Sequence, residues 1–313
     1  YYHLSQTDKG FDLLMILHQM ANHSLRRFLL TIVIFVFCII NLFLSSGCAI
    51  IMSSATSDMM EHLSSTILNN DDLPMVKAGA PAYLLMIDSL ISKDPKNKAL
   101  LANAAMLYTA YSDLFVKDRI RSKKMAQKAL NYANQAICLE KKDACMLKSG
   151  TFEDFEKIIS KMKKKQVPLL FSLGNAWSAW IMANKDDFNA IADMAHIEMI
   201  MKKVVELDDA YKEGAAYLYL GTLATLLPPA LGGKPELGKQ YFEKAVASSH
   251  GKNLMVKVIF AKLYAKMIFD RKLHDQLLEE VIATDPKIKG YTLVNTWAKI
   301  QAQELIDSAD DYF

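Results

Sequence analysis

The chain has 313 residues, a net charge of +3 and 52% apolar residues, which is a globular composition with room for one large domain or two small ones. Its many Ala, Leu, Met and Lys residues, with Gly at only 12 and Pro at only 8, favour helix. The nearly balanced charge excludes the strongly basic domain of a nucleic-acid-binding protein, so no nucleic acid is expected as a partner.

The first predicted element is an N-terminal export signal. Arg26 and Arg27 precede the long apolar run "FLLTIVIFVFCIINLFLSSGC", which ends in small residues. These are the three regions of a secretory signal. A plain membrane anchor is the competing interpretation, but the strictly apolar part is shorter than the roughly 20 residues that a membrane-spanning helix needs. We expect residues 1–47 to hold an upstream extension and a signal peptide over 20–47, with Met20 as the start.

The signal ends in a sequence that resembles a bacterial lipobox. In "LSSGC" small residues stand directly before Cys48, although Ser45 replaces the commonest leucine. In such proteins the cysteine thiol takes a diacylglycerol and the signal is cut before it. Several fatty chains, such as palmitate, anchor a protein firmly where one chain would be marginal. The sequence therefore predicts lipidation at Cys48 and a periplasmic protein held on a bacterial membrane.

Two cysteines, Cys138 and Cys145, remain in the mature chain. A disulfide between them would suit an oxidising periplasm, and two buried thiols are the alternative. No cysteines have the spacing of a zinc site, so no metal is expected.

A pair of helices recurs along the rest of the chain, and no stretch has the period of two that strands need. A 3-1-3 spacing of apolar and small residues occurs in three segments: Leu101, Ala104, Ala105, Tyr108; Leu170, Leu173, Gly174, Trp177; and Tyr217, Leu220, Gly221, Ala224. A 4-3 spacing occurs in Ala129, Ala133, Ala136 and in Gly238, Phe242, Ala245. Both are typical of tetratricopeptide (TPR) repeats, where a small residue lets the partner helix approach closely.

The spacings predict an all-α superhelix of about four degenerate TPR-like helix pairs over residues 78–313. A lipidated N-terminal tether is expected over residues 48–77. Pro95 and Pro286 follow charged turns and cannot continue the preceding helices. A divergent all-α bundle without true repeats is the alternative.

Two segments stand out between the predicted helices. "LLPPALGGKPELG" (226–238) is apolar yet full of helix breakers, so it is either a structured elbow or a binding surface. "SKMKKKQ" (160–166) is a short basic run. It is interpreted as a solvated helix end, with a phosphate or lipid site as the alternative.

The segments "NAWSAWI", "AAYLYLGTLATLLPPALGGKPELGKQYFEKAV", "VKVIFAKLYA" and "NTWAKIQAQELIDSADDYF" together resemble the TPR-containing T component of TRAP transporters. The resemblance covers most of the mature chain. It implies a lipid-anchored periplasmic protein that associates with the solute-binding P component and forms a homotrimer. It also implies a hydrophobic channel or cleft through each protomer. Because P components usually capture carboxylates, it further implies a hydrophobic or organic-acid ligand.

The candidate ligand- or partner-binding residues are aromatic and apolar side chains in the helices and the elbow. They are Tyr108, Trp177, Trp180, Tyr217, Leu227, Pro228, Pro229 and Leu231. Trp177 and Trp180 are three residues apart, which predicts one helix face. The hypothesis is that such aromatics line an apolar cavity, and core packing is the competing interpretation.

No catalytic constellation is found, so an enzyme and a cofactor are not expected. His196 with Glu198 lacks the two-histidine spacing of a helical zinc site, and neither a G-x-S-x-G elbow nor a P-loop is present. His250 and His274 are expected on the surface. The preferred function is a periplasmic scaffold that docks a P component and helps to deliver an organic acid. An envelope TPR interaction module unrelated to transport is the alternative.

Overall fold

The computed structural model describes residues 30–32, 35 and 62–313 of the chain. The signal peptide as a whole, Cys48 and the first part of the expected tether lie outside the described residues. The chain divides into two compact units, Tyr1–Ser64 and Ser65–Phe313. The described residues of the first unit are helical. Within the described ranges, no helix combines the length and the apolar character that crossing a membrane demands.

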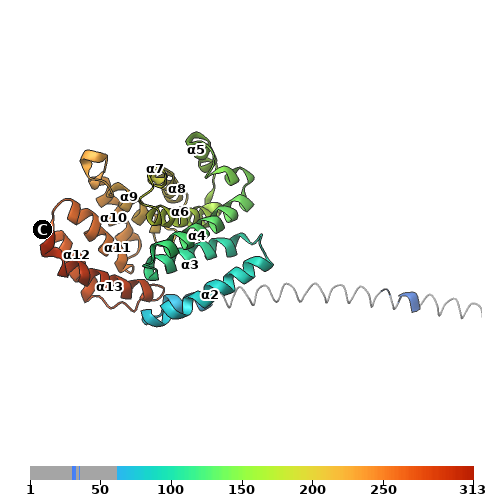
Figure 1. The fold of residues 1–313 in the computed structure, drawn as a ribbon, viewed down its shortest axis with the longest axis horizontal. Coiled ribbons are helices and arrows are strands. Elements are labelled where there is room, and N and C mark those ends of the chain that lie inside the picture. The colour runs from blue at the N-terminus through green and yellow to red at the C-terminus, as the bar shows by residue number, and fades with distance from the viewer. Residues whose placement is uncertain (1–29, 33–34, 36–61) are drawn as a thin grey trace, which may run out of the picture. The chain divides into compact units, whose positions relative to one another are not determined.

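The second unit is built from helices, and no strand occurs among its residues (Figure 1). The prediction of an all-α fold is therefore confirmed. The α-helices are α2 (Leu73–Lys93), α3 (Lys98–Phe115), α4 (Arg119–Glu140), α5 (Phe152–Ser160), α6 (Val167–Ala183), α7 (Phe188–Ala192), α8 (Met194–Leu207), α9 (Ala215–Ala224), α10 (Pro235–Ser248), α11 (Leu254–Ile259), α12 (Arg271–Ala283) and α13 (Thr292–Asp307). Four short 3-10 turns, η1 (Lys142–Met146), η2 (Lys164–Gln166), η3 (Pro229–Leu231) and η5 (Ala309–Asp311), and a π-helical turn, η4 (Phe260–Ala265), complete the unit.

Short polar side chains define where several helices begin. Asp72, Asn97 and Asp118 each accept a hydrogen bond from the backbone N–H three residues later, at the starts of α2, α3 and α4. Such caps satisfy N–H groups that have no partner inside the helix. Residues 62–68 are also helical and α2 begins at Leu73, so the expected boundary at residue 78 falls inside α2.

The helices pack in successive pairs: α3 on α4, α6 on α8, and α9 on α10. Small residues allow these close contacts. Ala104 and Ala105 of α3 are fully buried, as are Ala129 and Ala133 of α4. A Cβ atom at Gly221 of α9 would lie 2.9 Å from the ring of Phe242 in α10. The residues of the 3-1-3 and 4-3 spacings therefore lie at the helix contacts, as expected.

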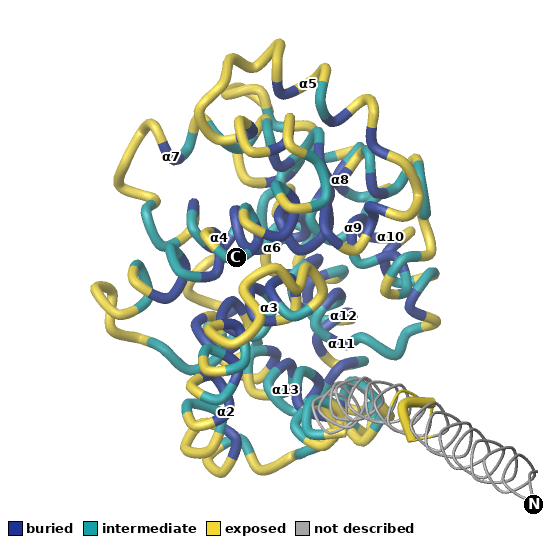
Figure 2. Tube along the Cα trace, turned by 90° about the vertical axis from the view of Figure 1, so that its right-hand side faces the viewer, coloured by how far each residue is buried: buried dark blue, intermediate teal, exposed yellow. Residues whose placement is uncertain are grey.

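The core runs along the facing sides of these helices. Figure 2 shows buried residues along α3, α4, α6, α8 and α9, whereas α5 and its flanking turns are largely exposed. In the C-terminal half, Phe242 stacks on Phe260 with ring centroids 5.1 Å apart. His274 of α12 is buried, with 1% of its surface exposed. Its predicted surface position is therefore wrong, because α12 turns this residue toward the ring of Phe313.

Two contacts tie together parts of the unit that are distant in sequence. Asn69, just before α2, accepts a hydrogen bond through Oδ1 from the backbone N–H of Gly290, at 2.7 Å. Asp71 and Lys287 form an ion pair at 2.8 Å. The segment before α2 thus meets the segment before α13.

A disulfide joins Cys138, near the end of α4, to Cys145 in η1. The alternative of two buried thiols is wrong, since Cys145 lies on the surface. The bridge holds the turn that leads from α4 toward α5.

Candidate functional site

Trp177 and Trp180 of α6 lie in different surroundings despite their spacing. Trp177 is buried, donates a hydrogen bond from Nε1 to Asp193 at 2.9 Å, and stacks on His196 with ring centroids 5.2 Å apart. Trp180 is half-buried and donates from Nε1 to Gln127 of α4 at 2.8 Å. The two indole rings therefore contact different neighbours of α6: Trp177 contacts His196 of α8, and Trp180 contacts Gln127 of α4.

Tyr108 of α3 belongs to a polar cluster that holds α2 against α3 and α4. The hydroxyl groups of Tyr108 and Tyr132 both donate to the Asp88 carboxylate at 2.7 Å, and Lys128 pairs with the same group. Burial raises the pKa of Asp88, but the hydrogen bonds from Lys128, Tyr108 and Tyr132 outweigh it and lower the pKa below its usual value. Tyr217 of α9 is also buried and stacks on Tyr241 with ring centroids 6.2 Å apart.

The segment from Leu226 to Lys234 forms an ordered elbow with an apolar outer side, and the last residues of the predicted 226–238 segment begin α10. The N–H groups of Leu231 and Gly233 both donate to the carbonyl of Pro228, at 2.9 Å and 3.1 Å. Gly233 is required because a Cβ atom there would collide with the Leu227 carbonyl. Pro228 and Pro229 are exposed, and so are the side chains of Leu227 and Leu231. The elbow is thus a rigid turn that presents apolar groups to solvent.

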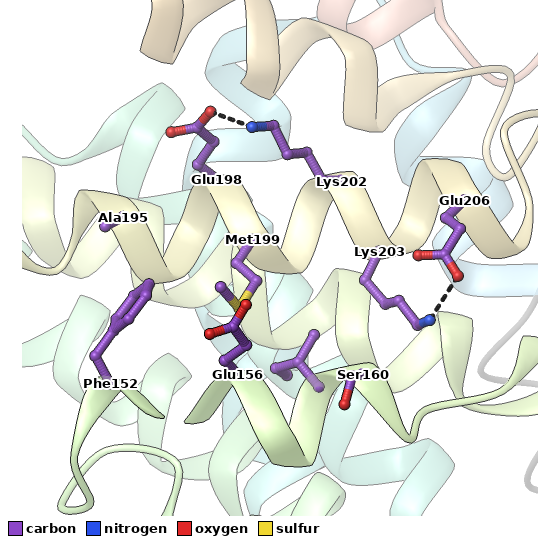
Figure 3. A pocket seen from close by; sticks show the side chains of 10 residues that line it. Phe152, Glu156, Ser160, Ala195, Glu198, Met199, Lys202, Lys203 and Glu206 are labelled. Carbon is purple, nitrogen blue, oxygen red and sulfur yellow. Dashed lines mark hydrogen bonds and ion pairs between the residues drawn. The ribbon is translucent and has the colours of Figure 1, made fainter. Parts of the chain in front are cut away.

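One cavity of about 580 Å³ lies between α5 and α8 (Figure 3). Phe152, Ile159 and Met199 supply its apolar surface. Its charged groups are largely paired with one another: Lys202 with Glu198 at 2.6 Å, and Lys203 with Glu206 at 2.7 Å. Internal pairing leaves little free charge to attract an ionic ligand.

A second cavity, of about 310 Å³, lies between the first turns of α3 and α6 and the segment that joins α8 to α9. The charged residues that line it are Lys98, Lys165, Lys212 and Glu140. Hydrogen bonds from Lys98 and Gln166, with the charge of Lys165, lower the pKa of Glu140 to about 2. Three lysines therefore face one carboxylate, and the lining carries an excess of positive charge.

The apolar residues of this second cavity are Ala99, Ala102, Met106, Pro168 and Leu169, together with the ring of Tyr211. The aliphatic residues come from α3 and α6, which pack side by side, and Tyr211 comes from the segment that joins α8 to α9. The combination of an apolar lining and a few convergent polar groups is typical of small-molecule sites. We name it the α3–α6 cavity.

Lys212, which lines this cavity, has a left-handed backbone conformation. Lys212, Glu213 and Gly214 have positive φ angles of 48°, 54° and 75°. Among the residues that the structure describes, Lys212 forms no ion pair. Water reaches its side chain, yet the protein around it partly desolvates the ammonium group and lowers its pKa.

Another group of polar side chains takes one residue each from α3, α6 and α9: Asp113, Asn175 and Tyr219. Asn175 donates a hydrogen bond to the hydroxyl of Tyr219, and its own Oδ1 is buried without a hydrogen-bond partner among the described residues. Water reaches Asp113, but surrounding protein raises its pKa to about 6 by desolvation. Desolvation also raises the pKa of Tyr219 to about 12. Asp113, Asn175 and Tyr219 are therefore polar side chains that the surrounding protein partly shields from water.

The sequence predicted eight ligand- or partner-binding residues in the helices and the elbow. None of these eight residues is part of the lining of either cavity. Lys98, Lys165 and Lys212 were missed as site residues, and the only signal was the basic run that contains Lys165. Lys98 begins α3, Lys165 lies in η2 and Lys212 lies between α8 and α9, so the three lysines come together only through tertiary packing. Among residues 62–313, no cluster of His, Cys, Asp and Glu could hold a metal ion.

A family model described as TRAP transporter T-component matches residues 69–313. A comparison with curated proteins gives no match. The matched range covers nearly the whole of the second compact unit, Ser65–Phe313.

Proposed function

Because the chain belongs to the TRAP transporter T-component family, and so has a role in TRAP transport, we propose that it associates with the solute-binding P component and binds a hydrophobic or organic-acid ligand. The observation that carries the proposal is the family match over residues 69–313. The family is a transporter component and not a known enzyme family, which favours binding over catalysis as the role of its cavities.

The helix pairs are degenerate TPR-like units of a superhelix in this proposal. The support is the close contact of small residues in one helix with the partner helix, as at Gly174, whose added Cβ would lie 2.6 Å from Met201 and 3.0 Å from Ile200 of α8. Helix pairs of this kind need their neighbours to bury a continuous core, and they create extended binding surfaces. The second compact unit, Ser65–Phe313, is the TPR-like domain in this proposal, and homotrimers are its proposed assembly.

The proposed location is the periplasmic side of a bacterial membrane, with a lipid anchor on Cys48 and a tether that ends where the second compact unit begins, at Ser65. The support is the lipobox-like sequence and the Cys138–Cys145 disulfide, because disulfides persist in oxidising compartments.

The elbow is the surface that we assign to the P component. Leu231 and Leu227 are 68% and 41% exposed and lie in an ordered turn. Exposed apolar groups on an ordered surface often mark protein contacts, and a preformed turn loses little entropy on binding.

The test is the affinity of the full chain for the P component of the same transporter, measured by surface plasmon resonance. Leu231→Asp should weaken binding by about 10-fold or more, since it places a charge in an apolar contact. Its melting temperature should stay near wild type because the residue is exposed. The matched control is Phe188→Asp, which changes an 88% exposed apolar residue on α7. Absence of wild-type binding, or equal effects of both variants, would contradict the proposal.

A further inference from the structure

The α3–α6 cavity holds a cation, Lys212, that contacts an aromatic ring instead of a carboxylate: its ammonium group lies 5.9 Å from the centroid of the Tyr211 ring. Lys98 and Lys165 are engaged with Glu140, at 2.5 Å and 3.6 Å. The carboxylate next to Lys212 in sequence, Glu213, is also engaged, since it pairs with Lys252 at 3.2 Å and accepts from the Tyr291 hydroxyl at 2.6 Å. Lys212 is therefore left without a carboxylate among the described residues.

The backbone at Lys212 is strained in a way that the fold does not require of a lysine. A left-handed conformation is unfavourable for residues other than glycine, and Asn tolerates it better than Lys. Gly214 suits the third left-handed position, but Lys212 and Glu213 do not. Strain of this kind persists where the surrounding structure enforces it, and it is often found at ligand sites. At Lys212 it places an ammonium group at the lining of a cavity.

The rest of the lining favours a ligand that is anionic at one end and apolar at the other. The first turns of α3 and α6 both border the cavity, and the positive end of a helix dipole favours an anion. Met106, Leu169 and Pro168 offer no polar partner and suit a hydrocarbon body. A cavity of about 310 Å³ is of the size that holds a small molecule.

We propose that the α3–α6 cavity binds a small monocarboxylic acid, with Lys212 receiving its carboxylate and the apolar residues of α3 and α6 receiving its hydrocarbon chain. The inference rests on the ligand-binding part of the proposed function and deepens it. Lys98 and Lys165 add positive potential, while Glu140 keeps them in place.

The experiment measures octanoate binding to the full chain by isothermal titration calorimetry, with octanol and inorganic phosphate as the other two probes. Lys212→Asn removes the cation and suits the left-handed backbone, so it should fold at least as stably as wild type. Its affinity for octanoate should fall by about 10- to 100-fold, the loss expected for a hydrogen bond to a charged group. Lys212→Gly, which also suits this backbone, serves as a second variant without the charge.

Two controls separate the site from general charge effects. Lys212→Arg keeps a cation and should bind octanoate within about 3-fold of wild type, a loss well under 1.4 kcal/mol. Lys185→Asn removes an exposed lysine outside the cavity and should bind like wild type. Octanol should bind more weakly than octanoate to wild type, and equally to wild type and Lys212→Asn.

The inference is overturned if octanoate does not bind to wild type, or if Lys212→Asn and Lys212→Gly bind it as well as wild type. Equal affinity for octanol or for phosphate would overturn the monocarboxylate assignment. Association with the P component is measured on the same samples. If association persists while Lys212 has no effect, the inference fails alone. If octanoate binding depends on Lys212 but the P component does not bind, the docking proposal fails alone.

Discussion

At the scale of single residues, Trp177 and Trp180 show how one helix can give similar side chains different roles. Trp177 is enclosed by Phe155 and His196, and its indole N–H is satisfied by Asp193. Trp180 is half-buried, with the Lys148 ammonium 4.2 Å from its ring centroid. Two residues three positions apart on one helix can therefore differ in burial.

The two tryptophans should respond differently to truncation. Trp177→Ala removes a fully buried ring and should lower the free energy of unfolding by about 3–5 kcal/mol. Trp180→Ala should cost less, because part of that ring already faces water. Chemical denaturation of both variants is the measurement. A larger loss for Trp180→Ala than for Trp177→Ala would contradict the difference in burial between the two rings.

Asp113 should make stability depend on pH in a direction opposite to that of a paired carboxylate. Desolvation raises its pKa from the ordinary 3.8 to about 6. Between these values the folded chain binds more protons than the unfolded chain, so this contribution to stability falls as the pH rises. Asp113→Asn should therefore melt at a higher temperature than wild type at pH 7.5, and the difference should be much smaller at pH 4 and disappear below the ordinary pKa of 3.8.

Thermal melting at both pH values checks this expectation. Asp311→Asn, which removes an exposed carboxylate near the C-terminus, is the control for a general change of charge. A constant difference between Asp113→Asn and wild type across the range would show that Asp113 is not desolvated.

At the scale of helices, the glycine contacts offer a matched pair of substitutions. Gly221→Leu would drive a side chain into the buried ring of Phe242, and overpacking of this kind costs roughly 1–3 kcal/mol. Gly79, in the middle of α2, has open space around the position of an added Cβ. Gly79→Leu should stabilise the protein slightly, because leucine favours helix more than glycine does.

Melting temperatures of the two variants test the pairing of α9 with α10. The melting temperature of Gly174→Leu should lie between those of Gly221→Leu and Gly79→Leu. The added side chain would meet the flexible methyl end of Met201, whereas at Gly221 it would meet the rigid ring of Phe242. Wild-type stability for Gly221→Leu would mean that α9 and α10 do not approach each other closely.

The helix contacts could be predicted from sequence because the spacing of small residues is a local pattern. Gly174 and Gly221 both lie where the 3-1-3 pattern expects close approach. The short helices α5 and α7 and the π-helical turn η4 carry no such pattern and were not predicted. The α3–α6 cavity was missed for a different reason. Lys98, Lys165 and Lys212 converge through tertiary packing, and a left-handed lysine has no signal in its own sequence.

At the scale of the whole second unit, the contact of Asn69 and Asp71 with Gly290 and Lys287 joins its two ends. Both side chains of the ion pair are at least half exposed, at 50% and 64%. Such pairs contribute little in isolation and are screened by salt. In about 1 M salt, amide hydrogen exchange in α2 and α13 should therefore accelerate slightly and by a similar factor, while α6 keeps its protection. Asp71→Asn should remove most of this salt dependence. A change of hydrogen exchange in α2 alone would contradict the coupling between the segments before α2 and α13.

This contact has a consequence for cooperativity. A linear array of helix pairs frays independently at its first and last helices, because each contacts a neighbour on one side only. In this unit the residues before α2 and before α13 are bound to each other, so an opening at one end exposes the other end as well. Terminal fraying is thereby converted from two independent local events into one shared event, and the unit should unfold closer to a two-state transition than an open array of the same length.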